Sequence, residues 1–80
     1  MKYYKIIYTY FSRGLMEEEE MMVGGLTLPD ALAYVRQMAY IFCHEDFEIS
    51  KVYAETETED GTGWTEVPDW AEIESQRKEG

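Results

Sequence analysis

Residues 2–11 form the stretch KYYKIIYTYF. It combines β-branched and aromatic residues at a density that is typical of a β-strand. A strand with one solvated face alternates apolar and polar residues, whereas here both faces are apolar. One face carries Tyr4, Ile6, Tyr8 and Tyr10, and the other carries Tyr3, Ile7 and Phe11. The stretch therefore predicts an inner strand of a sheet, and we expect a helix to cover the face that begins with Tyr4.

A turn at residues 12–14 is followed by LMEEEEMMV at residues 15–23. Helix propensity would allow a helix here, but four successive glutamates leave it no apolar stripe. An irregular acidic loop would be long for a compact domain. We favour a second strand at a sheet edge, where charge opposes edge-to-edge pairing. Met21 and Val23 would then face one way and Met22 the other.

The next segment has the start signature of a helix. Thr27 is the expected N-cap, Pro29 lies in the first turn, and Asp30 occupies the capping-box position. The helix should run to Phe42 or Cys43 and pack one face on the sheet. Its predicted apolar stripe consists of Leu28, Leu32, Val35, Ala39 and Phe42, widened by Ala31, Met38 and Ile41.

Residues 47–58 alternate in a pattern that predicts a third strand. Asp60-Gly61 lies at the centre of a predicted hairpin turn over residues 59–63, and residues 64–67 form a short fourth strand. Asp69 and Glu72 form a capping-box pair that predicts a short C-terminal helix. Simple alternation in the third strand would place Phe47, Ile49, Lys51 and Tyr53 on one face, and Val52 and Ala54 on the other.

These elements predict an α+β fold with the order β-β-α-β-β. A right-handed crossover would set the third strand beside the first, which gives a four-stranded antiparallel sheet of order 2-1-3-4. One helix covers one face, and a short helical turn ends the chain. The alternative is a three-stranded β-α-β-β sheet with a mobile acidic loop at residues 15–23. We expect a single domain over residues 1–80, with an ordered core at about 2–68 and a short helix or frayed tail at 69–80.

The charge is strongly negative, with 17 acidic against 7 basic side chains and a net charge of −10. Such a chain repels nucleic acid and anionic membranes and is attracted to basic surfaces. Cys43 has no second cysteine to pair with, which favours a reducing, cytoplasmic setting. No signal peptide is visible, and no apolar run approaches the roughly 20 residues that span a membrane. We therefore expect no direct nucleic-acid partner and no membrane partner.

The segment Cys43-His44-Glu45-Asp46 is the best indication of an enzyme. Its residues are adjacent, however, and structural zinc sites use spaced pairs of ligands. We expect Cys43 to pack as a small hydrophobe and His44 to lie favourably at the helix C-terminus. No glycine-rich phosphate loop is present. The chain is predicted not to be an enzyme and to have no catalytic residues, metal or cofactor.

Two groups of residues are predicted to contact a basic partner protein. Glu55, Glu57 and Glu59 alternate with threonines, so a continuous strand would hold their carboxylates on one face about 6.8 Å apart. The acidic group consists of Glu17, Glu18, Glu19, Glu20, Glu55, Glu57, Glu59, Asp60 and Glu66. The aromatic group consists of Tyr3, Phe11, Tyr53 and Trp64.

The combination of small size, acidity, low cysteine content and a helix on an antiparallel sheet, without a catalytic motif, resembles the phage-encoded anti-CRISPR and related anti-defence proteins. That resemblance implies an inhibitor that occupies a basic nucleic-acid-binding surface of a bacterial defence nuclease in the host cytoplasm. The alternative is a small structural or assembly protein that forms a homodimer through its aromatic sheet face.

Overall fold

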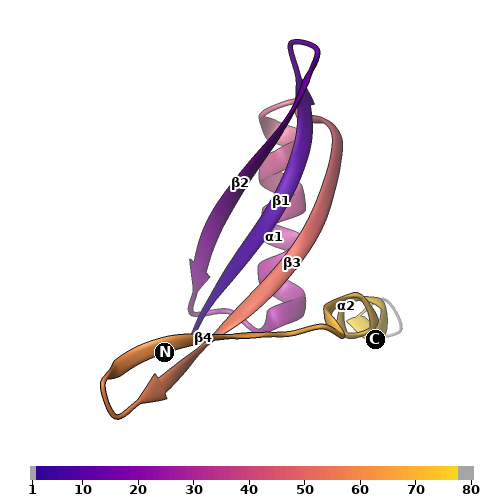
Figure 1. The fold of residues 1–80 in the computed structure, drawn as a ribbon. Coiled ribbons are helices and arrows are strands. Elements are labelled where there is room, and N and C mark those ends of the chain that lie inside the picture. Colours follow the sequence, from indigo (N-terminus) through magenta and orange to yellow (C-terminus); the bar gives the residue numbers. More distant parts are fainter. Residues whose placement is uncertain (1, 78–80) are drawn as a thin grey trace.

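The computed structural model describes residues 2–77. The four strands form one antiparallel sheet in the order β2-β1-β3-β4, and α1 lies behind it (Figure 1). The predicted α+β class and strand order are confirmed. The three-stranded alternative is wrong, because residues 15–24 form a ten-residue strand. The elements are β1 (Tyr3–Ser12), β2 (Leu15–Gly24), α1 (Leu28–Ile41), β3 (Glu45–Thr58), β4 (Gly61–Glu66) and α2 (Trp70–Arg77).

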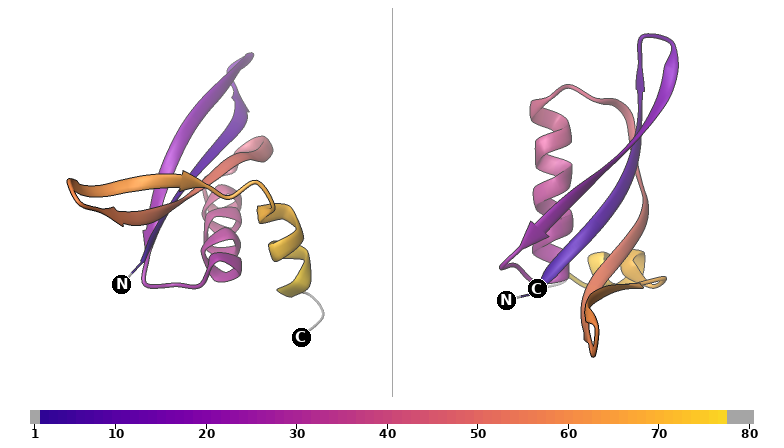
Figure 2. Two further views of the ribbon diagram at one scale, coloured as in Figure 1. Left: turned by 60° about the horizontal axis from the view of Figure 1, so that its bottom comes forward. Right: turned by 60° about the vertical axis from the view of Figure 1, so that its left-hand side comes forward.

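The helix covers the expected face of β1. Ile6 is fully buried and Tyr8 is 6% exposed, whereas Tyr3 and Phe11 on the other face are 40% and 37% exposed. The sheet seen obliquely has α1 on one side only (Figure 2, right). Burial of an aliphatic side chain contributes about 1.5–3 kcal/mol to the free energy of unfolding, so the buried Ile6 side chain is a main source of stability.

Both ends of α1 are defined by backbone and side-chain hydrogen bonds. The Thr27 hydroxyl accepts from the Asp30 N–H at 3.4 Å, as the cap signature predicts. At the other end the Cys43 N–H donates to the Tyr40 carbonyl at 3.1 Å, and the His44 N–H donates to the Ala39 carbonyl at 3.0 Å. This bond pair, with Cys43 at a positive φ of 57°, forms a Schellman motif.

The predicted stripe of α1 is buried over most of its length. Leu28, Leu32, Val35 and Ala39 are all buried, as is Ala31 beside them. Phe42 was predicted to extend the stripe and is instead 59% exposed. It occupies the C-cap with φ −83° and ψ 2°. The chain there no longer follows the helical repeat, so the stripe ends one turn earlier.

Strand β3 departs from simple alternation. Ile7 pairs with Lys51 and Tyr8 pairs with Ile49, so Ser50 is an extra residue in β3. Such a β-bulge reverses which residues face each side. Ile49 and Val52 are consequently both buried under α1. The predicted split, with Ile49 on one face and Val52 and Ala54 on the other, is wrong for this reason.

The hairpin between β3 and β4 is tighter than predicted. Thr58 pairs with Gly61, so the turn contains only Glu59 and Asp60, and β4 begins at Gly61 rather than at Trp64. Gly61 has a φ of 129°, a conformation that favours glycine. The Thr58 hydroxyl donates to the Gly61 carbonyl at 3.0 Å. Glu59 therefore leaves the strand that was expected to hold it beside Glu55 and Glu57.

Helix α2 lies beside α1, with which it is in contact (Figure 2, left). Trp70 and Ile73 are partly buried against the core. Arg36 of α1 donates two hydrogen bonds to the Glu74 carboxylate, at 2.6 and 2.9 Å. The Asp69 carbonyl accepts from the first turn of α2. The predicted tail beyond Arg77 lies outside the described residues. Neither helix of residues 2–77 has the length and apolar character needed to cross a membrane.

Candidate protein-binding surface

The sheet face opposite α1 is not covered by any element of residues 2–77, and we call it the open face (Figure 1). Residues that stand opposite each other on neighbouring antiparallel strands share a face. The even-numbered residues of β1 from Tyr4 to Tyr10 pack in the core, so the odd-numbered residues of β1 lie on the open face. The strand register then shows which residues of the other strands share that face. The odd-numbered residues of β1 are Tyr3, Lys5, Ile7, Thr9 and Phe11.

All four residues of the predicted aromatic group lie on the open face. Tyr53 stands opposite Lys5, and Trp64 stands opposite Glu55, two residues further along β3. Tyr3 and Trp64 are 40% and 37% exposed. Phe11 is about 26 Å from Tyr3 along β1, at the rise of a strand. The structure thus gathers Tyr3, Tyr53 and Trp64 at one end and leaves Phe11 at the other.

Two local contacts hold these rings in place. The Lys5 ammonium lies 4.6 Å from the centroid of the Trp64 ring, a cation–π distance that links β1 to β4 across β3. The Tyr3 ring lies against Gly24, where a Cβ atom would come within 2.4 Å of it. Gly24 therefore provides the space that Tyr3 occupies. The rings are fixed on the surface without being buried.

The acidic group is divided between the two faces of the sheet. Glu18 and Glu20 stand opposite Thr9 and Ile7, so they lie on the open face, whereas Glu17 and Glu19 lie on the α1 side. Glu55, Glu57 and Glu66 also lie on the open face, while Glu59 and Asp60 form the hairpin turn. The run of four glutamates is therefore two pairs on opposite surfaces, rather than one patch.

Two acidic residues of the open face were missed by the sequence reasoning. Glu48 stands opposite Thr9, and Glu45 stands opposite Phe11. Their placement depends on the register shifts in β3, for which the sequence pattern gives no signal. With them, the open face carries seven carboxylates and two ammonium groups, those of Lys5 and Lys51. The open face is strongly negative around Ile7, and its aromatic side chains lie toward its two ends.

A recess of about 200 Å³ lies on β1 and β2, and it combines both characters. Its lining consists of Ile7, Glu18, Glu19 and Glu20. An apolar floor beside carboxylates suits the side chain of lysine or arginine, whose methylene stem packs on apolar surface while its charged head stays near acids.

On the α1 side, Glu19 is already engaged within the fold. The Tyr8 hydroxyl donates to the Glu19 carboxylate at 3.3 Å. Burial raises the pKa of Tyr8, and the negative charge and hydrogen bond of Glu19 raise it further. Burial also raises the pKa of Tyr10, with added contributions from the hydrogen bond and charge of Glu19 and from the charge of Glu17. Glu19 thus binds Tyr8 at the edge of the core, and its predicted contact with a partner stays a prediction.

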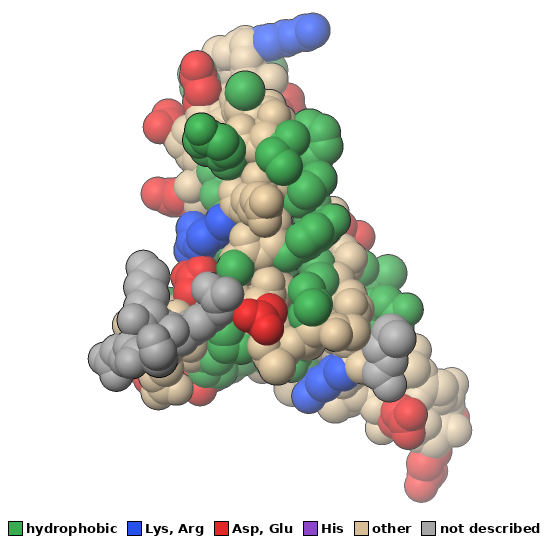
Figure 3. Space-filling view, turned by 180° about the vertical axis from the view of Figure 1, so that it is seen from behind, with side chains coloured by type: hydrophobic (Ala, Val, Ile, Leu, Met, Phe, Trp, Pro, Cys, Tyr) green, Lys and Arg blue, Asp and Glu red, His purple; other side chains and the backbone are tan. Residues whose placement is uncertain are grey.

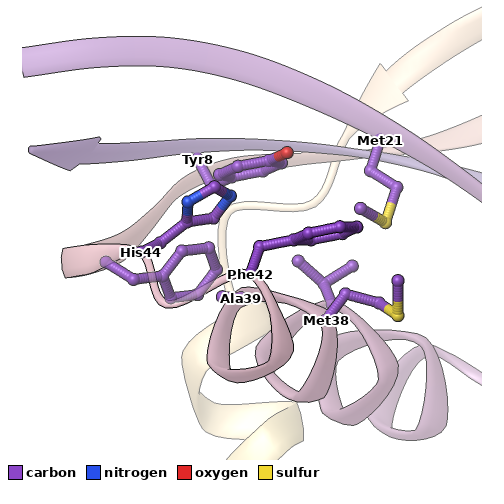
Figure 4. A pocket seen from close by; sticks show the side chains of 8 residues that line it. Tyr8, Met21, Met38, Ala39, Phe42 and His44 are labelled. Carbon is purple, nitrogen blue, oxygen red and sulfur yellow. The ribbon is translucent and has the colours of Figure 1, made fainter. Parts of the chain in front are cut away.

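The segment Cys43–Asp46 does not converge on a reactive centre. Cys43 is exposed, contrary to the expected packing, because it occupies the left-handed position after α1. The His44 ring stacks on Tyr10 with centroids 3.8 Å apart. Figure 4 shows His44 and Phe42 beside Tyr8, around a cavity of about 10 Å³, which is the space of one water molecule. No group of three or more metal-ligating residues occurs within residues 2–77.

Comparisons with protein-family models, with curated proteins and with solved structures found no match to this chain. The aromatic group, the seven carboxylates of the open face and the recess at Ile7 all lie on the same uncovered surface.

Proposed function

We propose that the chain is a non-enzymatic binding protein that docks the open face on a basic protein surface. The observation that carries this proposal is the joint placement of exposed Tyr3, Phe11 and Trp64 with seven carboxylates on one uncovered sheet face. Aromatic residues are enriched in protein interfaces. Charge complementarity between the carboxylates and a basic surface selects the partner and accelerates its association.

The size of the surface indicates what kind of interface it makes. The strands contain 10, 10, 14 and 6 residues. At a rise of about 3.3 Å per residue and a spacing of about 4.8 Å between strands, they give the open face roughly 600 Å². A standard interface buries about 800 Å² per partner. Affinity must therefore rest on a few well-placed side chains and on charge, rather than on area. The Ile7 recess and the exposed Trp64 ring are the two contact points that fit this requirement.

The partner that we propose is the nucleic-acid-binding surface of a CRISPR effector or another bacterial defence nuclease. Such surfaces are lined with lysine and arginine, because they neutralise a phosphate backbone. A net charge of −10 and carboxylates repeated along the strands complement a surface of this kind. Binding there would displace the nucleic acid and inhibit the nuclease, as the resemblance to anti-CRISPR proteins implies.

A competition assay tests this proposal. The chain is titrated into guide-RNA-loaded CRISPR effector nucleases that hold fluorescent target DNA, and DNA release is followed by anisotropy. Glu20→Lys, beside the Ile7 recess, should weaken inhibition about tenfold or more, because it places a like charge against the basic surface. The matched control is Glu72→Lys, the same charge reversal on α2. Equal inhibition by both variants, or no release of DNA by the wild type, would contradict the proposal.

The alternative is a homodimer that buries the two open faces against each other. Its exposed aromatic side chains favour this arrangement, whereas two copies of −10 charge repel each other at low salt. Light scattering on a sizing column distinguishes the two cases. A dimer that is stable at about 50 mM salt and that dissociates in the Phe11→Ser variant would favour the homodimer.

A further inference from the structure

Strand β2 presents a long and regular free edge. It pairs with β1 over ten residues, with no register shift, and it has no strand on its other side. Natural edge strands are commonly protected by a bulge, a proline, short length or a covering element. Within the described part of the chain, β2 has none of these and relies on Glu17–Glu20 alone. Alternate backbone N–H and C=O groups along this edge are therefore open to a further strand.

An apolar groove lies beside the C-terminal half of the same edge. It has a volume of about 460 Å³ and runs between the end of β2, the loop before α1, and the helix. Met22, Leu26 and Tyr34 in its lining are all exposed. Viewed from behind, hydrophobic side chains gather in a band along this side of the molecule (Figure 3). The edge thus has an acidic half at residues 17–20 and an apolar half at residues 21–24.

We infer that β2 accepts an extended basic segment of the partner protein as a fifth strand of the sheet. The inference rests on the proposed function for the basic character of the partner, and it adds how the partner binds. Side chains of an added strand alternate between the two faces. On the open face they would meet Glu18, Glu20 and the recess at Ile7. On the α1 side they would meet Glu17 at one end and the Leu26–Tyr34 groove at the other.

Charge complementarity identifies the occupant. A second copy of this chain that paired through β2 would bring two runs of four glutamates to the same junction, and like charges on paired strands are destabilising. A segment with lysine and arginine at one end and β-branched residues at the other satisfies both halves of the edge. The glutamates therefore reject the chain's own copies while they select a basic strand.

Synthetic peptides test strand addition directly. The probes are acetylated TVIVTRKRK, whose basic half meets residues 17–20 in an antiparallel arrangement, and the reversed peptide KRKRTVIVT for a parallel one. One variant of each peptide carries Glu in place of every Lys and Arg. Two further variants carry N-methyl groups on alternate backbone amides, one on the odd-numbered and one on the even-numbered residues, and we call these the two N-methyl phases. Fluorescence anisotropy against the full chain measures the affinities.

An added strand bonds to its neighbour through alternate residues only. One N-methyl phase should therefore lose at least about tenfold in affinity, while the other phase binds nearly as the parent peptide does. The glutamate peptides should not bind. In the chain itself, Leu26→Ser and Tyr34→Ser should weaken the basic peptide about tenfold, and the matched control Tyr40→Ser, at a residue of α1 that is 84% exposed and outside the groove, should not.

Equal binding of the two N-methyl phases would overturn strand addition, and so would the absence of any binding by either basic peptide. Neither result contradicts docking through the open face if Glu20→Lys still weakens inhibition in the nuclease competition assay. Phase-dependent peptide binding without any nuclease inhibition would instead support strand addition and contradict the proposed nuclease partner.

Discussion

Tyr8 on β1 and Glu19 on β2 stand opposite each other, and the tyrosine hydroxyl donates a hydrogen bond of 3.3 Å to the carboxylate. Tyr8 is buried at the edge of the core, and its ring lies 5.2 Å from that of Phe47. This hydrogen bond connects the acidic half of β2 to a side chain of the core. Because burial and the charge of Glu19 both oppose ionisation, the pKa of Tyr8 is raised above 10.0.

Replacement of Tyr8 by phenylalanine should change the alkaline stability of the protein. The unfolded chain ionises Tyr8 at its ordinary pKa of 10.0 and the folded chain only at higher pH. The unfolding free energy therefore falls as the pH rises above that value. In Tyr8→Phe this fall should be smaller between about pH 9 and pH 11, as measured by urea unfolding. Tyr10, whose pKa is also raised, leaves a residual slope.

The same substitution removes one hydrogen bond, so we expect Tyr8→Phe to lose about 0.5–1.5 kcal/mol at neutral pH. The control Tyr40→Phe, at an exposed position, should reproduce the wild-type profile. An alkaline slope for Tyr8→Phe equal to that of the wild type would show that the tyrosine–glutamate pair does not contribute.

Glycine at position 43 should stabilise the fold. Cys43 occupies the left-handed position of the Schellman motif with φ 57°, where a side chain costs about 1 kcal/mol and glycine does not. We expect Cys43→Gly to raise the unfolding free energy by about 0.5–1 kcal/mol. Cys43→Ala keeps the Cβ atom and should give no gain. A loss of stability in Cys43→Gly relative to Cys43→Ala would argue against the left-handed conformation.

Deletion of Ser50 should be tolerated, because Ser50 is the extra residue of the bulge. Ile7 pairs with Lys51 and Tyr8 with Ile49, so removal of Ser50 gives regular pairing and keeps both Ile49 and Val52 on the core face. Deletion of Tyr53, where the pairing with β1 is regular, would instead turn Ala54 and the residues after it to the opposite face. We expect the Ser50 deletion to keep cooperative thermal unfolding and the Tyr53 deletion to lose it. Loss of cooperative unfolding in the Ser50 deletion alone would contradict the register described above.

The dominant patterns of the sequence were sufficient to predict the strand order and the covered face. Apolar residues on both sides of β1 require an inner strand, and the Thr27–Asp30 cap fixes the start of α1. The bulge at Ser50 was not predictable, because an extra residue depends on how two strands pair and leaves no mark in composition. The same shifts in β3 placed Glu45 and Glu48 on the open face. The left-handed conformation of Cys43 was also not predictable, because glycine is the residue that usually marks this position after a helix.

The Arg36–Glu74 ion pair shows another limit of sequence reasoning. It joins residues 38 positions apart and depends on how α2 docks. Exposed pairs of this type contribute at most about 1 kcal/mol, whereas the partly buried Ile73 contributes apolar packing. Ile73→Ala should therefore lower the urea midpoint more than Arg36→Ala does. The reverse order would mean that the ion pair, and not the apolar contact, holds α2.

The most direct test of open-face docking is the dissociation constant for a guide-RNA-loaded CRISPR effector, measured by interferometry for the wild type, Trp64→Ala and Tyr40→Ala. Both residues are exposed aromatics, but Trp64 lies on the open face and Tyr40 on α1. We predict that Trp64→Ala weakens binding by about tenfold or more and that Tyr40→Ala binds as the wild type does. Equal affinities for the two variants, or no binding by the wild type, would contradict the proposal.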